Sequence, residues 1–217
     1  MPVLGAYSLT LEVPNIEDGV RFYQDAGLDA TVSGQTATLS CKGQDHEVIV
    51  LLGGFPRKRL HHVTLRASDL DALSRSVVQA GGSVVDAPER FSDVGLWVTD
   101  PHGLLIHLVD RPADPPLAEC TEFRINAPGR LQRIRRSAVL PQSAYPPATP
   151  LRLGHILLFS PDVPASVRFV TEGLGMGLAD RARSTSSPLR AHARTATITC
   201  WPSPSRPASV STTPASR

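Results

Sequence analysis

The chain has 217 residues, which is long enough for one large domain or two small ones. Its hydrophobic fraction of 41% is ordinary for a globular protein, and its formal net charge of +2 favours neither a nucleic-acid partner nor a membrane surface. No apolar run is long enough to cross a bilayer, and no signal peptide is evident at the N-terminus. Cys41, Cys120 and Cys200 lie far apart and suggest no disulfide framework, so we expect a cytoplasmic location.

Proline divides the chain by composition, because most of the 20 prolines follow residue 111. Residues 1–111 have the composition of a folded domain, and residues 112–150 that of a proline-rich connector. Residues 151–182 again look globular, whereas residues 183–217 contain no Asp, Glu, Lys or Gly and are rich in Ser, Thr, Pro, Ala and Arg. This composition predicts disorder for residues 183–217.

One pattern occurs three times along the chain. The copies are "YSLTLEVPNIEDGVRFYQDAGLDATV" from Tyr7, "HVTLRASDLDALSRSVVQAGGSVV" from His62 and "HILLFSPDVPASVRFVTEGLGMGL" from His155. Each begins with an alternating strand, continues through a helix cap into a helix of about ten residues, and ends in glycine. The expected cap residues are Asn15, Ser68 or Asp69, and Asp162.

Three further short strands follow the helix in each of the first two copies. They are "LDATV", "TATLSCK" and "HEVIVLL" in the first copy, and "SVVDA", "VGLWVTD" and "LLIHLVD" in the second. The repeating unit is therefore strand–helix–strand–strand–strand, with residues 1–55 forming unit 1 and residues 56–111 forming unit 2. One such unit leaves a concave sheet face open, and pairing two units closes that face into a cup.

This βαβββ unit, with "LHHVTLRASD" and "VTDPHGLLIHLVDR", resembles the vicinal oxygen chelate superfamily of glyoxalases, bleomycin resistance proteins and extradiol dioxygenases. The resemblance is strongest to catechol 2,3-dioxygenase-like, type I extradiol enzymes, and it covers about residues 3–182. It implies an α+β fold of paired βαβββ modules. Units 1 and 2 would form a metal-free domain, and residues 151–182 would be the truncated start of a catalytic domain, an incomplete third module.

The resemblance also implies a metal site. Such dioxygenases hold Fe(II) or Mn(II) with two histidines and a glutamate, and leave positions open for a catechol-type substrate and dioxygen. The first histidine lies on the first strand of the third unit, and it corresponds to His155. The second histidine and the glutamate belong to a fourth unit, for which we find no counterpart in this sequence.

Two other histidines take comparable places in unit 2. His62 aligns with His155, and His107 stands where metal-binding relatives carry glutamate. Unit 1 offers Ser8 where another histidine would be needed, so a structural role is the favoured interpretation of His62 and His107 over a relic metal site. By strand alternation, we expect His61 to point away from His62 into solvent.

The composition of residues 183–217 is typical of GC-rich DNA translated out of frame. A shift by two bases through "TITCW" at 197–201 permits His-His-Met-Leu, and the same shift through "VSTTPAS" at 210–216 permits Phe-His-His-Ala-Ser. The second string resembles the strand that carries the second metal histidine in the family. We therefore interpret residues 183–217 as an out-of-frame tail.

The sequence thus predicts a chain of extradiol dioxygenase lineage with little or no ring-cleaving activity. Two alternatives stay open. One is a non-enzymatic binder of small molecules that uses the cup of units 1 and 2. The other is a glyoxalase-type, metal-dependent isomerase that uses His62 and His107 across a dimer. The exposed strand of the third unit also predicts self-association.

Overall fold

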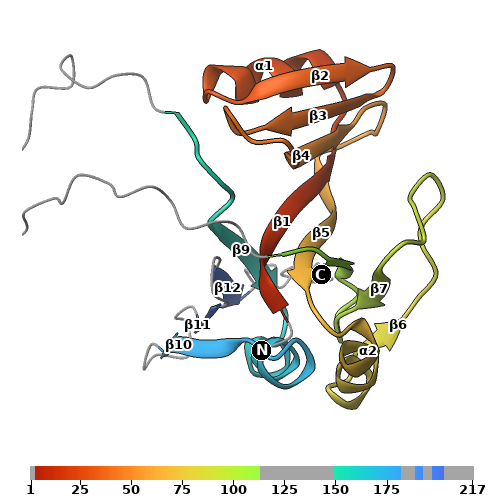
Figure 1. The fold of residues 1–217 in the computed structure, drawn as a ribbon, viewed down its shortest axis with the longest axis vertical. Coiled ribbons are helices and arrows are strands. Elements are labelled where there is room, and N and C mark those ends of the chain that lie inside the picture. The colour runs from red at the N-terminus through yellow and green to blue at the C-terminus, as the bar shows by residue number, and fades with distance from the viewer. Residues whose placement is uncertain (1–2, 113–148, 182–188, 193–196, 203–217) are drawn as a thin grey trace, which may run out of the picture.

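The computed structural model describes residues 3–112, 149–181, 189–192 and 197–202. Most of the predicted connector and parts of the predicted tail lie outside these residues. Two mixed sheets are present (Figure 1), one of eight strands in the order β2-β3-β4-β1-β5-β8-β7-β6 and one of four in the order β10-β11-β12-β9. Together with the helices they give the α+β fold that the sequence predicts. No helix within the described segments is long and apolar enough to cross a membrane.

The first two units have the predicted strand–helix–strand–strand–strand order. Unit 1 consists of β1 (Val3–Glu12), α1 (Ile16–Asp25), β2 (Asp29–Ser33), β3 (Thr36–Ser40) and β4 (Glu47–Leu52). Unit 2 consists of β5 (Arg59–Ala67), α2 (Leu70–Gln79), β6 (Ser83–Val84), β7 (Leu96–Thr99) and β8 (Leu105–Asp110). In each unit the first and last strands pair in parallel, as β1 with β4 and β5 with β8.

The third unit contains all five parts of the repeat, which corrects the expectation of an incomplete module. Its elements are β9 (His155–Ser160), α3 (Val163–Arg168) continued by the π-helical turn η2 (Phe169–Gly173), β10 (Gly177–Arg181), β11 (Leu189–His192) and β12 (Thr197–Pro202). β12 pairs in parallel with β9, with Ile198 opposite Ile156, as β4 pairs with β1. The prediction of disorder is therefore wrong for residues 189–192 and 197–202.

The predicted helix caps are confirmed. The side chains of Asn15, Asp69 and Asp162 accept hydrogen bonds from the backbone amides of Asp18, Ala72 and Ala165. Each bond satisfies one of the amides that a helix leaves unpaired in its first turn. These short polar residues therefore fix where each helix leaves its strand.

Units 1 and 2 join through the antiparallel pairing of β1 with β5. Leu9 lies opposite Val63, Ser8 opposite Thr64 and Thr10 opposite His62. The pairing is interrupted by register shifts, so that Tyr7 in β1 and His61 in β5 have no opposite residue. An unpaired residue of this kind is a β-bulge, which bends a strand and redirects side chains.

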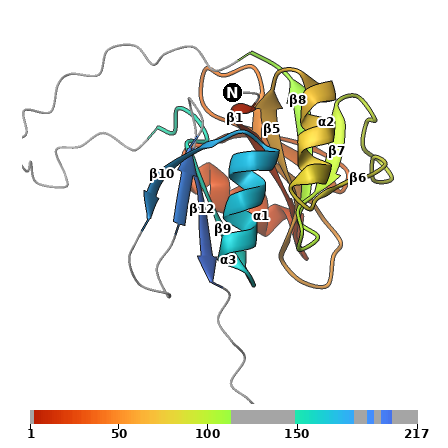
Figure 2. The same ribbon diagram turned by 90° about the horizontal axis from the view of Figure 1, so that it is seen from below.

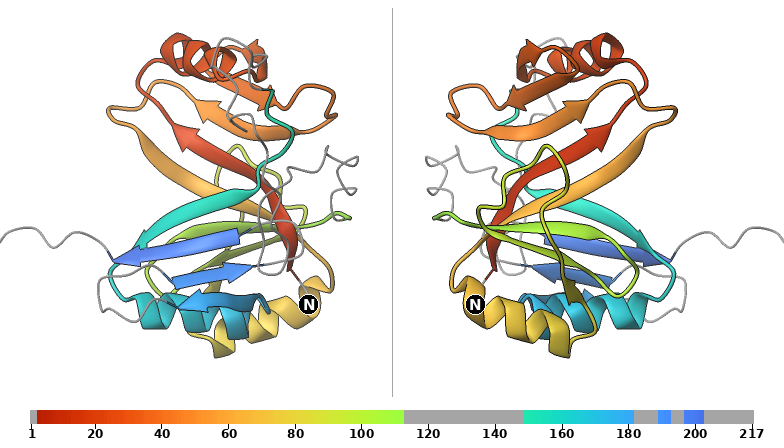
Figure 3. Two further views of the ribbon diagram at one scale, coloured as in Figure 1. Left: turned by 90° about the vertical axis from the view of Figure 1, so that its left-hand side faces the viewer. Right: turned by 90° about the vertical axis from the view of Figure 1, so that its right-hand side faces the viewer.

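Unit 3 packs on unit 2 through its helix, and Figures 2 and 3 show the two helices side by side. Phe169 in η2 and Val77 in α2 are buried members of one apolar cluster, to which β5 and β8 also contribute. Ser76 Oγ donates a hydrogen bond of 2.7 Å to the carbonyl of Gly173. A Cβ added at Gly82 would lie 2.5 Å from Phe169 Cε2, so only glycine admits the ring at this distance.

Candidate functional site

The concave face of units 1 and 2 forms a cup with a cavity of about 750 Å³. Small-molecule sites commonly have volumes of roughly 300–1,000 Å³. Strand alternation sends Ser8, Thr10, His62 and Thr64 to this side, while Val63 and Leu65 face the apolar core. His107 of β8 also lines the cup. The structure therefore places Ser8, His62 and His107 around one cavity, as the repeat predicts.

An aromatic wall surrounds His62. The rings of Trp97 and His107 stack in parallel at 4.1 Å, and those of His62 and Trp97 meet edge to face at 4.9 Å. Phe91 contacts His62 from the loop between β6 and β7, also at 4.9 Å between ring centroids. His62 itself is 2% exposed. Trp97 and Phe91 were not among the residues expected at the site. Trp97 lies directly opposite His107 in the pairing of β7 with β8, so both side chains lie on the same face of the sheet.

Hydrogen bonds occupy the nitrogens of His62. Its Nε2 shares a bond of 3.2 Å with Thr10 Oγ1, and its Nδ1 shares one of 2.8 Å with Nδ1 of His61. His107 Nε2 donates to the carbonyl of Val94 at 2.8 Å, which leaves Nδ1 of its neutral ring as the acceptor nitrogen. The pair therefore makes hydrogen bonds of the kind that structural histidines make.

The expectation for His61 is wrong, because the side chain is half-buried and bonded to His62. The physical reason is the β-bulge at this residue, which suspends the alternation from which its direction was predicted. Tyr7 is bulged in the same way at the equivalent position of unit 1, and it also lines the cup.

Burial keeps the histidines of the cup uncharged. It lowers the pKa of His62 from 6.5 to about 3, with smaller contributions from the charges of His61 and His107. Burial likewise lowers the pKa of His61 and of His107, although the hydrogen bond to Val94 opposes the shift at His107. At neutral pH the cup therefore presents neutral imidazoles rather than cations.

His155 lies at the start of β9, in the other sheet, and is exposed. Leu157 and Phe159 share its face and are 50% and 64% exposed, whereas Ile156 on the opposite face is 3% exposed. The predicted alternation of β9 is thus confirmed. The face that carries His155 corresponds to the cup face of unit 1, but in the described part of the chain no second unit closes over it.

The described residues do not fit a complete metal site. Nowhere in the described segments do three His, Cys, Asp or Glu side chains come together, either at His155 or at His62 and His107. Of the acids in unit 3, Asp162 caps α3 and Glu172 lies in η2. A facial site for Fe(II) or Mn(II) needs three protein ligands, so these residues alone cannot supply one.

Comparisons with known proteins agree with this architecture. Residues 152–213 match the family model of the Glyoxalase/Bleomycin resistance protein/Dioxygenase superfamily. This match extends past residue 182, where we expected the resemblance to end. Metapyrocatechase 2 of Cupriavidus necator is 29% identical over 174 residues, which cover 79% of this chain and 52% of the relative. The chain thus spans about half the length of the curated relative that it matches.

Solved structures share the fold. The Mn(II)-bound glyoxalase from Novosphingobium aromaticivorans superposes with a TM-score of 0.65 at 23% identity, over 94% of this chain and 63% of that one. The 2,3-dioxygenase LapB from Pseudomonas sp. KL28 superposes with a TM-score of 0.66 at 20% identity, over 94% and 72%. These likenesses show that the chain shares the fold of the solved structures, and the two sequence matches make it similar to the glyoxalase/bleomycin resistance protein/dioxygenase superfamily and to a metapyrocatechase.

Proposed function

We propose that this chain derives from an extradiol ring-cleavage dioxygenase for catechol-type aromatics, and that His155 occupies the place of its first metal ligand. The observation that carries the proposal is the position of His155. It starts the first strand of a third βαβββ unit, on the face equivalent to the cup face that holds Ser8 in unit 1 and His62 in unit 2. The sequence similarity to a metapyrocatechase supports the same lineage.

We further propose that the 217-residue chain has little or no ring-cleaving activity. In the family, Fe(II) or Mn(II) supplies the chemistry by binding catechol and dioxygen together. His155 would contribute one imidazole to such a site, and the described residues do not gather three His, Cys, Asp or Glu side chains around it. Residues 1–111 would act as the metal-free domain. The out-of-frame origin of residues 183–217 stays a prediction, which the nucleotide sequence of codons 182–185 tests.

The experiment is a ring-cleavage assay. The 217-residue chain, loaded anaerobically with Fe(II) and then given oxygen and catechol or a dihydroxybiphenyl, is expected to form no yellow ring-fission product. An active extradiol dioxygenase, loaded in parallel, controls for the iron and the substrate. Product formation by the chain that disappears in His155→Ala would contradict the proposed inactivity, because it would demonstrate a working site at His155.

The same samples test a second candidate function, the binding of small molecules in the cup. The cavity of about 750 Å³ and its wall of Phe91, Trp97 and His107 favour this candidate. A binder is expected to gain thermal stability from an aromatic ligand without metal, and to lose the gain in Trp97→Leu. The glyoxalase-type alternative has no comparable support, since His62 and His107 gather no third ligand among the described residues.

A further inference from the structure

The edge of β9 is open in the described part of the chain. β9 ends the order β10-β11-β12-β9 and pairs only with β12 there. Its counterparts in units 1 and 2, β1 and β5, also pair in parallel with the last strand of their own units. On their remaining edges, β1 and β5 pair with each other. Unit 3 therefore repeats the architecture of units 1 and 2 except for the antiparallel partner of its first strand.

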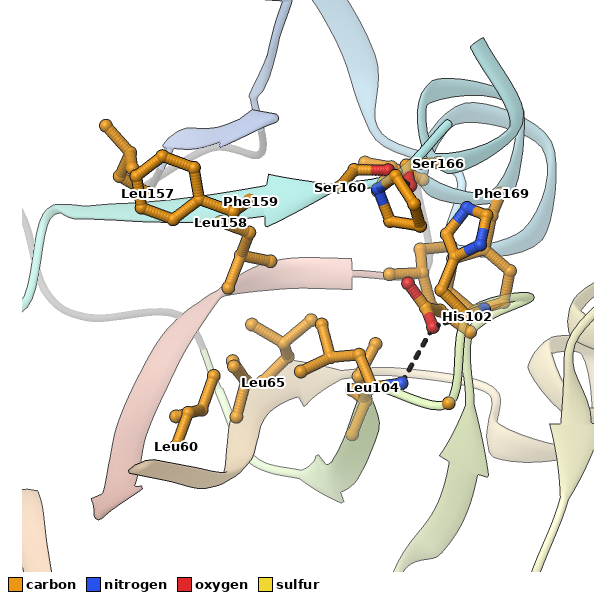
Figure 4. A pocket seen from close by; sticks show the side chains of 17 residues that line it. Leu60, Leu65, His102, Leu104, Leu157, Leu158, Phe159, Ser160, Ser166 and Phe169 are labelled. Atoms are coloured by element: carbon orange, nitrogen blue, oxygen red, sulfur yellow. Dashed lines mark hydrogen bonds between the residues drawn. The ribbon is translucent and has the colours of Figure 1, made fainter. Parts of the chain in front are cut away.

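A groove runs along this open edge. A cavity of about 450 Å³ lies between β9 and unit 2, and five consecutive residues, 157–161, line it. A cavity on one face of a strand would contact alternate residues only, so contact with the four successive residues 157–160 of β9 indicates that it opens onto the strand edge. Figure 4 shows Leu158 pointing across this space toward Leu60 and Leu65. The groove is therefore an apolar space beside unpaired backbone.

The internal repeat supplies a register for a partner strand. Leu9 and Val63 lie opposite each other in the antiparallel pairing of β1 with β5. In the alignment of the three repeats, Ile156 takes the position of both residues. A strand with the β9 sequence would therefore pair with β9 about Ile156, which sets His155 opposite Leu157 of the second strand. The bulged residues Tyr7 and His61 correspond to Gly154, and glycine is well suited to a bulge.

The side chains of β9 do not oppose such pairing. Exposed edge strands usually carry a charge, a proline or a bulge that prevents the addition of another strand. Residues 155–160 carry no Lys, Arg, Asp, Glu or Pro. Leu157 and Phe159 are half exposed or more on the face beside His155. Burial of these two side chains against another copy would remove apolar surface from water.

We propose that β9 pairs antiparallel with β9 of a second copy of this chain, about a two-fold axis at Ile156. The dimer repeats between two chains the pairing that β1 and β5 make within one. It brings both His155 side chains to a single shared face, at the positions that Ser8 and His62 hold in the cup. A second copy is the favoured occupant because its register is self-complementary. This proposal does not depend on the ring-cleavage lineage.

The first experiment measures the mass of the 217-residue chain in solution by analytical ultracentrifugation. Wild type is expected to be a dimer at micromolar concentration, and Leu157→Lys a monomer. Val32→Lys is the matched control, because Val32 is 54% exposed on β2, an edge strand of the other sheet. It is expected to remain a dimer. A monomeric wild type would overturn the proposal and would indicate that another segment of the same chain occupies the groove. Equal dissociation of the Leu157→Lys and Val32→Lys dimers would also overturn it.

The second experiment tests the register by disulfide formation, in a background with Cys120→Ser and Cys200→Ser. Directly opposed residues of an antiparallel pair bring their Cβ atoms close enough for a disulfide, and diagonal residues do not. A mixture of His155→Cys and Leu157→Cys proteins is therefore expected to cross-link under mild oxidation, and at least tenfold faster than either protein alone. Cross-linking at equal rates in all three samples would contradict the register and with it the proposal.

Discussion

Replacing Phe169 by alanine is expected to lower the free energy of unfolding by about 3–5 kcal/mol. The ring is 1% exposed and sits against Gly82 and Gly173, between the helices of units 2 and 3. Its removal leaves a cavity that the helices cannot fill, because a hydrogen bond from Ser76 to Gly173 fixes their spacing. Urea denaturation followed by circular dichroism measures the loss.

The matched control is Phe22→Ala, because Phe22 is 66% exposed on α1. This variant is expected to change stability by about 0.5 kcal/mol or less. If Phe169→Ala has an equally small effect, unit 3 does not pack on unit 2 as described. The contrast between the two phenylalanines therefore tests whether units 2 and 3 share one core.

Acid is expected to destabilise the protein through the cup. His62 is neutral in the folded protein down to about pH 3, whereas in the unfolded chain it binds a proton near its ordinary pKa of 6.5. The unfolded state therefore binds more protons between these two values, and stability falls as the pH falls through this window. A shift of this size corresponds to a loss of about 1 kcal/mol per pH unit, or roughly 2–3 kcal/mol between pH 6.5 and 4.5.

Denaturation at a series of pH values measures this slope. His62→Gln is expected to flatten it while keeping a hydrogen-bonding side chain beside Thr10. A shallower slope remains, because burial lowers the pKa of His61 and His107 in the same direction. His102→Gln, at an exposed loop position, serves as the control and is expected to leave the slope unchanged. A slope identical in wild type and His62→Gln would contradict a buried, neutral His62.

The repeat made much of the fold predictable. The spacing of cap, helix and glycine located the three helices. The predicted alternation of the first strand of unit 2 agrees with Val63 and Leu65 in the core and His62 in the cup. Alternation failed at His61, because a bulge shifts the register there and sequence alone does not reveal such a shift. The residues around His62 were therefore only partly foreseen.

The strands of residues 189–192 and 197–202 were missed for a different reason. Composition averaged over residues 183–217 indicates disorder, but strand formation depends strongly on the partner that a segment finds. Thr197, Ile198 and Thr199 are β-branched residues, and their backbone pairs with β9. Taken alone, the segment "TITCW" has the β-branched composition of a strand, and averaging over residues 183–217 removes this signal.

An anaerobic Fe(II) titration of the 217-residue chain, followed by removal of loose metal and elemental analysis, tests most directly whether His155 belongs to a complete metal site. Far less than one equivalent of tightly bound iron per chain is expected, with no difference between wild type and His155→Ala. This follows because a facial site needs three protein ligands, and the described residues do not gather three around His155. One equivalent of iron per chain that is lost in His155→Ala would contradict the proposed inactivity.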